Sequence, residues 1–140
     1  MSVDHKPYNE LEQRRIEAAG GSVTMRRVNG DLAVSRALGD FAYKHARDLP
    51  PQAQQVSAEP EIRYVERSPS DAFLVLACDG VWDVMSNAEV GEFLLERVRG
   101  GIEALDELAG ALIDECLARG SRDNISAVVV AFAGAPTPSL

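Results

Sequence analysis

The feature that most limits the possible folds is a pair of short apolar runs, Ala72–Cys78 and Ile125–Phe132. Both are shorter than a usual helix and almost free of polar residues, which is typical of strands covered on both faces. Asp79 directly follows the first run, and Asp123 precedes the second. If the two strands are neighbours in one sheet, as we assume, these carboxylates converge at one edge of it.

Helical patterns surround these runs. Ser86 and Glu89 have the spacing of a capping box, in which each satisfies a free amide of the first helical turn. Apolar residues follow at helical spacing, and a second such segment ends at Gly120. An earlier short helix ends at Gly20-Gly21. This order of strands, helices and a strand predicts an α+β fold with helices packed against a sheet. The apolar helix positions are Leu11, Ile16, Val90, Phe93, Leu94, Val98, Leu105, Leu108, Leu112 and Cys116.

The remaining segments are read from turn signals. Asn29-Gly30 lies between apolar alternations and predicts a β-hairpin, because both residues tolerate positive φ. Glu61–Glu66 is interpreted as a strand with Ile62 and Tyr64 on one face. Residues 134–140 are expected to form a flexible tail.

Composition excludes some classes of function. The chain has 140 residues, enough for one domain or part of one, with a formal charge of −8 and a pI near 4.7. Nucleic-acid binding needs a basic patch, so we expect no nucleic-acid partner. No apolar run approaches the roughly 20 residues that span a bilayer, and no secretory signal is seen. Cys78 and Cys116 lack metal-ligand spacing and suggest buried reduced thiols in a cytoplasmic or nuclear protein.

The two aspartates next to the apolar runs leave two interpretations open. Burying ionised carboxylates without partners costs several kcal/mol, so they would be protonated, paired or bound to metal. Carboxylate oxygens suit Mg²⁺ or Mn²⁺, and Asp83 lies nearby in the sequence as a further donor. Alternatively, Asp79 caps the next turn and Asp123 forms an Asx turn. The residues alone do not decide between a metal site and these structural roles.

Several motifs in a fixed order carry a resemblance to a known family. The chain from about Asp4 to Phe132 resembles the metal-dependent serine/threonine protein phosphatases of type 2C, also called the PPM family. The motifs that carry it are DHKP at 4–7, EQRRIEAAGGSV at 12–23, RVNGDLAVSRALGD at 27–40, EPEI at 59–62, LACDGVWDVMSN at 76–87 and GSRDN at 120–124.

The resemblance implies a fold, a reaction and site residues. The fold is part of an α-β-β-α layered sandwich, two antiparallel sheets flanked by helices, with two or more Mg²⁺ or Mn²⁺ ions at one end. The implied reaction is dephosphorylation of phosphoserine and phosphothreonine proteins by a metal-activated water. Asp79 and Asp123 correspond to metal ligands, and Asp83 to a weaker third-metal position. Arg27 falls in the flap beside the substrate cleft, and Asn124 is expected to orient Asp123.

The sequence also departs from the family's pattern. The phosphate-binding arginine, acidic pair, Asp-Gly-His-Gly block and Gly-Asp-Ser-Arg block that open the catalytic domain do not occur. We therefore expect residues 1–133 to be the C-terminal portion of that domain, with its N-terminal part missing, and assign no catalytic residue to this chain. DHKP and SRALGD are expected to be structural, and His5 is not expected to be the general acid.

Two expectations follow from this departure. We expect a fragment with little activity alone; the alternative is a non-catalytic, phosphatase-like module that binds or regulates a partner. Loss of half a sandwich would uncover apolar faces and strand edges, so self-association through those faces is expected. Apart from other copies of the chain, phosphoprotein substrates are the expected partners, and we expect no association with a membrane.

Overall fold

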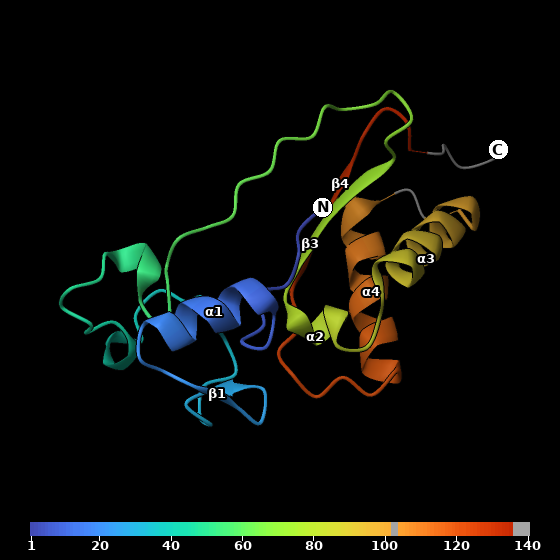
Figure 1. Cartoon of the computed structure of the whole chain (residues 1–140). Coiled ribbons are helices and arrows are strands. Elements are labelled where there is room, and N and C mark those ends of the chain that lie inside the picture. The colour runs from blue at the N-terminus through green and yellow to red at the C-terminus, as the bar shows by residue number, and fades with distance from the viewer. Residues whose placement is uncertain (102–103, 136–140) are drawn as a thin grey trace. The chain divides into compact units, whose positions relative to one another are not determined.

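Helices and short antiparallel strands build the chain, as the computed structural model shows for residues 1–101 and 104–135 (Figure 1). They group into two units, Met1–Val65 and Glu66–Leu140. The predicted α+β class is confirmed in the described ranges. Most of the predicted tail, residues 136–140, lies outside them. None of the helices in these ranges combines the length and apolar character that crossing a bilayer requires.

The Met1–Val65 unit is built around one helix, α1 (Glu10–Ala18). The helix ends as predicted: Gly20 has a φ of +79°, and the amide of Gly21 donates to the carbonyl of Ile16 at 2.9 Å. Ile16 is fully buried, whereas Leu11, the other apolar position named for this helix, is 77% exposed. The rest of the unit consists of short elements and loops: β1 (Val23–Thr24), β2 (Arg27–Val28), and the 3₁₀ helices η1 (Phe41–Tyr43) and η2 (Pro51–Ala53).

The predicted hairpin is only partly correct. The strands β1 and β2 pair antiparallel, and their turn lies at Met25 and Arg26, both with positive φ. Asn29-Gly30 does form a turn with positive φ, but it closes only a single bridge between Val28 and Leu32. Non-glycine residues rarely adopt positive φ, so the sequence did not reveal the turn at Met25.

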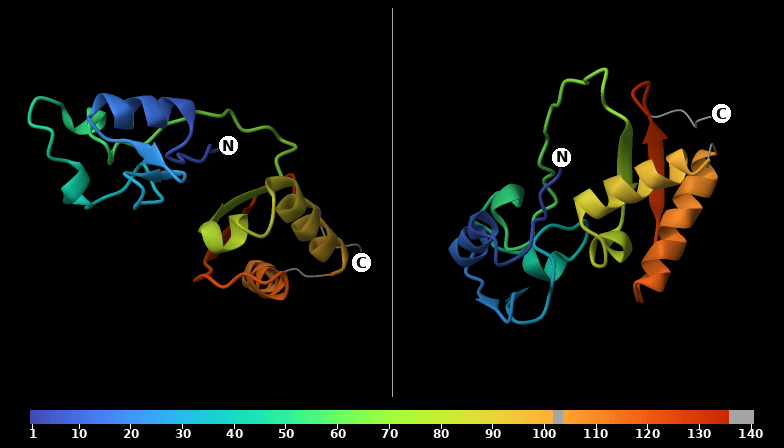
Figure 2. Two further views of the ribbon diagram at one scale, coloured as in Figure 1. Left: turned by 60° about the horizontal axis from the view of Figure 1, so that its bottom comes forward. Right: turned by 90° about the vertical axis from the view of Figure 1, so that its right-hand side faces the viewer.

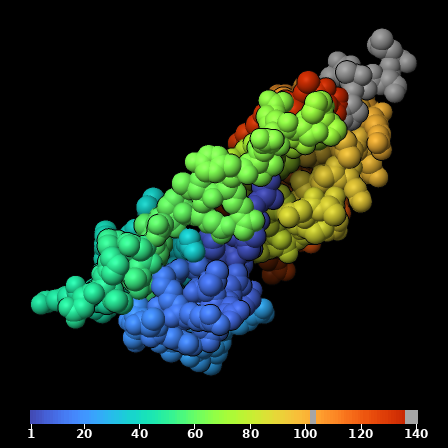
Figure 3. Space-filling model, turned by 45° about the horizontal axis from the view of Figure 1, so that its top comes forward, coloured from blue at the N-terminus to red at the C-terminus, as the bar shows by residue number. Residues whose placement is uncertain are grey.

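The predicted strand at Glu61–Glu66 is wrong. Residues 58–68 contain no strand and are exposed along their whole length; Figure 3 shows this stretch, in light green, at the surface. Tyr64 is 94% exposed. A strand needs a partner for its backbone groups, and no strand among the described residues pairs with this segment.

The Glu66–Leu140 unit is a two-stranded sheet with helices. Its strands β3 (Phe73–Ala77) and β4 (Ala127–Ala131) pair antiparallel with Val75 opposite Val129. The assumption that the two apolar runs are neighbouring strands is therefore confirmed. The chain between them forms α2 (Asp79–Trp82), α3 (Asn87–Arg99) and α4 (Leu105–Ala118), which Figure 2 shows from two further directions.

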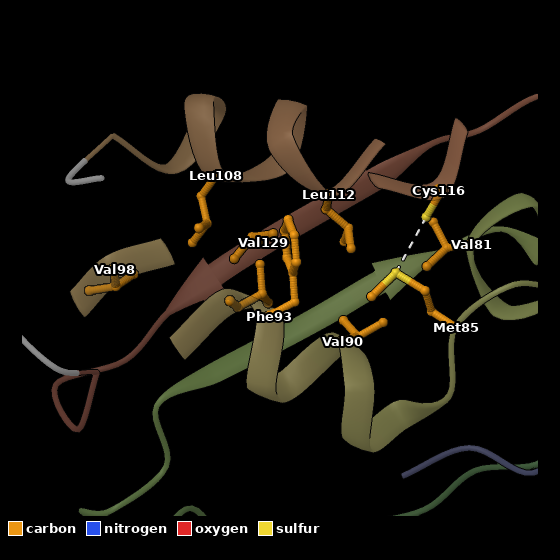
Figure 4. Packing of buried hydrophobic residues seen from close by; sticks show 10 residues of the cluster. Val81, Met85, Val90, Phe93, Val98, Leu108, Leu112, Cys116 and Val129 are labelled. Atoms are coloured by element: carbon orange, nitrogen blue, oxygen red, sulfur yellow. Dashed lines mark hydrogen bonds between the residues drawn. The ribbon is translucent and has the colours of Figure 1, made fainter. Parts of the chain in front are cut away.

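The two faces of this sheet differ. Alternate residues of β3 and β4 pack against the helices, and Figure 4 shows the apolar side chains of α3, α4 and β4 pointing toward one another. The opposite face is not covered: Leu76 is 53% and Val128 57% exposed. The prediction that both faces are buried is wrong for the described residues. The core consists of Val81, Met85, Val90, Phe93, Leu94, Val98, Leu108, Leu112, Cys116 and Val129.

The predicted capping box at the start of α3 is confirmed. The amide of Glu89 donates to Ser86 Oγ at 3.3 Å, and the amide of Ser86 donates to Glu89 Oε2 at 2.8 Å. Arg119, just after α4, donates to Glu89 Oε1 at 2.6 Å. The hydrogen bonds from the Ser86 backbone and hydroxyl, followed by that from Arg119, lower the pKa of Glu89 to about 2. The cap therefore also joins the start of α3 to the end of α4.

Candidate metal centre

The short helix α2 places two of the predicted site residues. Asp79 is its first residue, and the amide of Asp83 donates to the Asp79 carbonyl at 2.8 Å. Residues four apart lie on the same side of a helix, so both carboxylates, which are exposed, share one side of α2. The helix is anchored by buried Val81 and by Trp82, whose indole Nε1 donates to the Ala77 carbonyl at 2.9 Å. Trp82 thus has a packing role at the edge of the core.

The loop before β4 lies directly against α2. Ser121 Oγ donates to the Gly80 carbonyl at 2.8 Å, and Cys78 Sγ donates to the Asn124 carbonyl at 3.1 Å. A Cβ atom on Gly80 would lie only 2.5 Å from that same carbonyl oxygen. Asp79 and Asp123 therefore sit on two segments in direct contact, as expected from strand pairing. The hydroxyl of Ser121 was not singled out from the sequence, because nothing in its spacing indicates its partner.

Asp123 is held by the backbone. Its Oδ1 accepts a hydrogen bond from the amide of Asn124 at 2.7 Å. Within the described part of the chain, no hydrogen bond joins the side chain of Asn124 to Asp123, so the predicted orienting role of that side chain has no contact to support it here. The capping role considered for Asp79 is not seen either, since the N-cap of α2 is Cys78.

The charges at this edge are open to solvent. Asp79, Asp83 and Asp123 are all exposed, and none forms an ion pair with another described residue. The premise that these carboxylates are buried was therefore wrong, because one face of the sheet and this edge are uncovered. Exposed carboxylates carry no desolvation cost that a partner would have to offset.

The donor chemistry fits a hard divalent cation. Mg²⁺ takes oxygen ligands and usually binds through one or two carboxylates while keeping several waters. Asp79 and Asp123 supply two such carboxylates from touching segments, and Asp83 a third nearby. Across residues 1–101 and 104–135, no group of three or more His, Cys, Asp or Glu side chains is close enough to hold a metal. Waters or other groups would have to complete the coordination.

The two thiols have different surroundings. Hydrogen bonding from Ser126, whose amide donates to Cys78 Sγ at 3.2 Å, lowers the pKa of Cys78. Burial raises the pKa of Cys116, which lies in the core beside Met85. Both cysteines are free, but only Cys116 is fully buried as predicted; Cys78 is half-buried.

The other predicted residues belong to the Met1–Val65 unit. Arg27 lies on β2 with an exposed side chain, and its Nη1 donates to the Asp31 carbonyl at 2.5 Å. The DHKP and SRALGD motifs contact each other, because Ser35 Oγ lies 2.5 Å from the carbonyl oxygen of His5. His5 Nε2 lies 2.9 Å from Glu61 Oε2. The contacts of Ser35 and His5 support a structural role for the two motifs, whereas the place of Arg27 beside a substrate cleft stays a prediction.

Comparison with known proteins decides the family. The family described as protein phosphatase 2C matches residues 1–125. The chain belongs to the protein phosphatase 2C family. Human "Protein phosphatase 1A" is 50% identical over 140 residues, which cover 99% of this chain and 36% of the relative. Rat "Protein phosphatase 1B" is 52% identical over 136 residues, which cover 97% of this chain and 35% of the relative. This phosphatase 2C chain thus spans about a third of the length of the curated relatives it matches.

Solved structures show the same fold. A phosphatase from a pathogenic strain of Toxoplasma gondii is 42% identical with a TM-score of 0.87, and the match covers 95% of this chain and 41% of that one. A sex-determining protein of C. elegans is 31% identical with a TM-score of 0.77, and the match covers 92% of this chain and 31% of that one. The phosphatase 2C assignment therefore rests on sequence and structure together.

Proposed function

We propose that this chain forms part of a protein phosphatase that removes phosphate from phosphoserine and phosphothreonine proteins. The observation that carries the proposal is the contact between the segments of Asp79 and Asp123, at Gly80 and Asn124, in a chain of the phosphatase 2C family. Asp79 and Asp123 would hold Mg²⁺ or Mn²⁺, and Asp83 would hold a weaker third ion. We also propose a cytoplasmic or nuclear location, which the two free cysteines support.

The residues of this chain would bind the metal ions and orient the substrate, and none of them would attack the phosphate itself. Bound divalent ions supply a water of lowered pKa and neutralise the charge of the phosphate. The backbone amide of Asn124 fixes one oxygen of Asp123, and the other oxygen would be available to a cation. Arg27 donates one guanidinium hydrogen bond to the carbonyl of Asp31. The planar guanidinium group has further N–H donors, which would be available to a phosphorylated segment.

We propose that the chain by itself has little phosphatase activity. The described residues bring no three candidate ligands together, and the chain spans about a third of its curated relatives. The second candidate function is a non-catalytic phosphatase-like module that binds or regulates a partner. It is favoured by the same lack of three candidate ligands close together among the described residues. The two candidates differ in whether the aspartates bind metal.

Mn²⁺ titration by calorimetry separates these candidates. The chain is expected to bind Mn²⁺, and Asp79→Asn is expected to weaken binding by at least about 10–100-fold, since even groups that only orient metal ligands matter this much. Asp114→Asn, an exposed change on α4, is the matched control and should leave affinity unchanged. The same samples are assayed on a phosphothreonine peptide. Equal affinity in all three proteins would contradict the proposed metal site, and rapid turnover would contradict the proposed low activity.

We also predict that two copies of the chain associate through the uncovered face of the β3–β4 sheet. The side chains on that face, Leu74, Leu76, Val128 and Val130, are all apolar. Two such faces meet without charge repulsion, although the chain carries a net charge of −8. Sedimentation velocity over a range of concentrations is expected to show a dimer, and Leu76→Lys to favour the monomer. A wild-type chain that stays monomeric at high concentration would rule this out.

A further inference from the structure

The Met1–Val65 unit has a small apolar core and a buried carboxylate beside it. The core consists of Ile16, Val28 and Val56, with a few half-buried neighbours. Glu12, on α1, is only 2% exposed. Glutamate is seldom buried unless its charge is paired, so this residue needs strong partners. Its surroundings were not predicted from the sequence.

Three side chains satisfy Glu12. Arg36 Nη2 donates to its Oε1 at 2.6 Å, Arg15 Nη1 donates to its Oε2 at 2.7 Å, and Ser35 Oγ donates to Oε2 at 2.7 Å. Burial raises the pKa of Glu12, but the hydrogen bonds from Arg36, Ser35 and Arg15 outweigh it and lower the pKa to about 2. Two of these donors come from the loop after the hairpin, more than 20 residues away in the sequence.

Arg15 extends this network to the second loop of the unit. Its Nε donates to the carbonyl of Gln54 at 3.1 Å, and its Nη2 donates to the carbonyl of Ser35 at 2.6 Å. With Nη1 on Glu12, the arginine is held at three points. The orientation of the Gln54–Gln55 backbone is therefore linked to the charge of Glu12.

Gln55 carries the link to the hairpin. Its Oε1 accepts a hydrogen bond from Asn29 Nδ2 at 2.9 Å, and Asn29 Oδ1 accepts one from the amide of Ser22 at 2.9 Å. The amide of Asn29 also donates to the carbonyl of Ser22 at 2.7 Å. Asn29 thus closes the base of the hairpin segment 22–31, and Gln55 ties that base to the loop that Arg15 holds.

We propose that Glu12 is a positioning residue that, through Arg15 and Gln55, holds the hairpin segment 22–31 that carries Arg27. Only the importance of this for dephosphorylation rests on the proposed function. The positioning itself is a property of the Met1–Val65 unit. In that unit the hairpin also packs, through buried Val28 and half-buried Val23 and Leu32, on a small apolar core. A charged hub with directional hydrogen bonds sets an orientation that apolar packing leaves less defined.

Amide hydrogen exchange of the full 140-residue chain, followed by NMR, tests the proposal. The probes are the hydrogen-bonded hairpin amides of Val28, Asn29 and Leu32. Glu12→Gln keeps the side-chain shape but removes its charge, and hairpin exchange is expected to accelerate by at least about tenfold. Glu17→Gln, an exposed change on the same helix, should leave it unchanged. Amides of β3 and β4 in the other unit serve as the internal reference.

A second variant separates positioning from general stability. Gln55→Met keeps the length of the side chain and removes its hydrogen bonds, while Glu12 and its donors stay in place. It also removes the hydrogen bond that Gln55 Nε2 donates to the carbonyl of Ala19, just after α1, at 3.3 Å. It is expected to accelerate hairpin exchange by about the same factor as Glu12→Gln, without affecting the amides inside α1. In the double variant the two effects should not add, because they interrupt one path. Unchanged hairpin exchange in Gln55→Met, full additivity, or equal acceleration in α1 and the hairpin in that variant would each overturn the proposal.

Discussion

Replacing Leu112 with alanine is expected to lower the free energy of unfolding of the Glu66–Leu140 unit by about 2–5 kcal/mol. Leu112 is fully buried on α4, in the core that α3, α4 and the inner face of the sheet share (Figure 4). Truncation removes buried methyl groups and leaves a cavity, because the surrounding helices and sheet relax only in part. Urea unfolding followed by the fluorescence of Trp82, the only tryptophan, measures this unit.

The control for this prediction lies on the same helix. Leu117 is 54% exposed, so Leu117→Ala should change the free energy of unfolding by no more than about 0.5 kcal/mol. Equal losses in the two variants would mean that α4 does not pack on the sheet through Leu112.

Gly80→Ala is expected to destabilise the same unit by about 1–3 kcal/mol and to weaken Mn²⁺ binding at the same time. The added Cβ would lie 2.5 Å from the carbonyl oxygen of Asn124 and 3.1 Å from the side chain of Ile125. The first neighbour is backbone and cannot turn away, so α2 and the loop before β4 must separate. That separation moves Asp79 away from Asp123. Urea unfolding and calorimetric Mn²⁺ titration measure the two effects.

Gly91→Ala is the matched control for Gly80→Ala. Gly91 lies inside α3, and no atom lies within 4 Å of where its Cβ would be. Alanine favours a helix interior over glycine, so stability should rise by about 0.5–1 kcal/mol with no change in Mn²⁺ affinity. If Gly80→Ala were as stable as the wild type, the close contact between the two aspartate segments would be refuted.

Local patterns were enough to predict most of the Glu66–Leu140 unit. The capping box at Ser86, the apolar stripes of α3 and α4, and the two strands depend on neighbours within a few residues. Each was found where expected, except that Leu105 of α4 is 42% exposed. The pairing of β3 with β4 was an assumption, which the structure confirms. The motifs around Asp79 and Asp123 also led to the phosphatase 2C family, which the comparisons confirm.

Long-range contacts decided what the patterns missed. The sheet has one uncovered face because α3 and α4 pack on the opposite face. An apolar run in the sequence is the same whether its strand is covered on one face or on two. The hairpin turns at Met25 and Arg26, since pairing of the flanking strands outweighs the low preference of these residues for positive φ.

The residues alone predicted the family, the helices, the two apolar strands and the aspartates that the resemblance assigns to metal. Only the tertiary structure showed that these aspartates are exposed, that Gly80 touches Asn124, and that Glu12 is buried among Arg15, Ser35 and Arg36. The physical reason is the range of the interactions. Helix caps and periodicity act within a few residues, whereas burial and ion pairing depend on segments that only folding brings together.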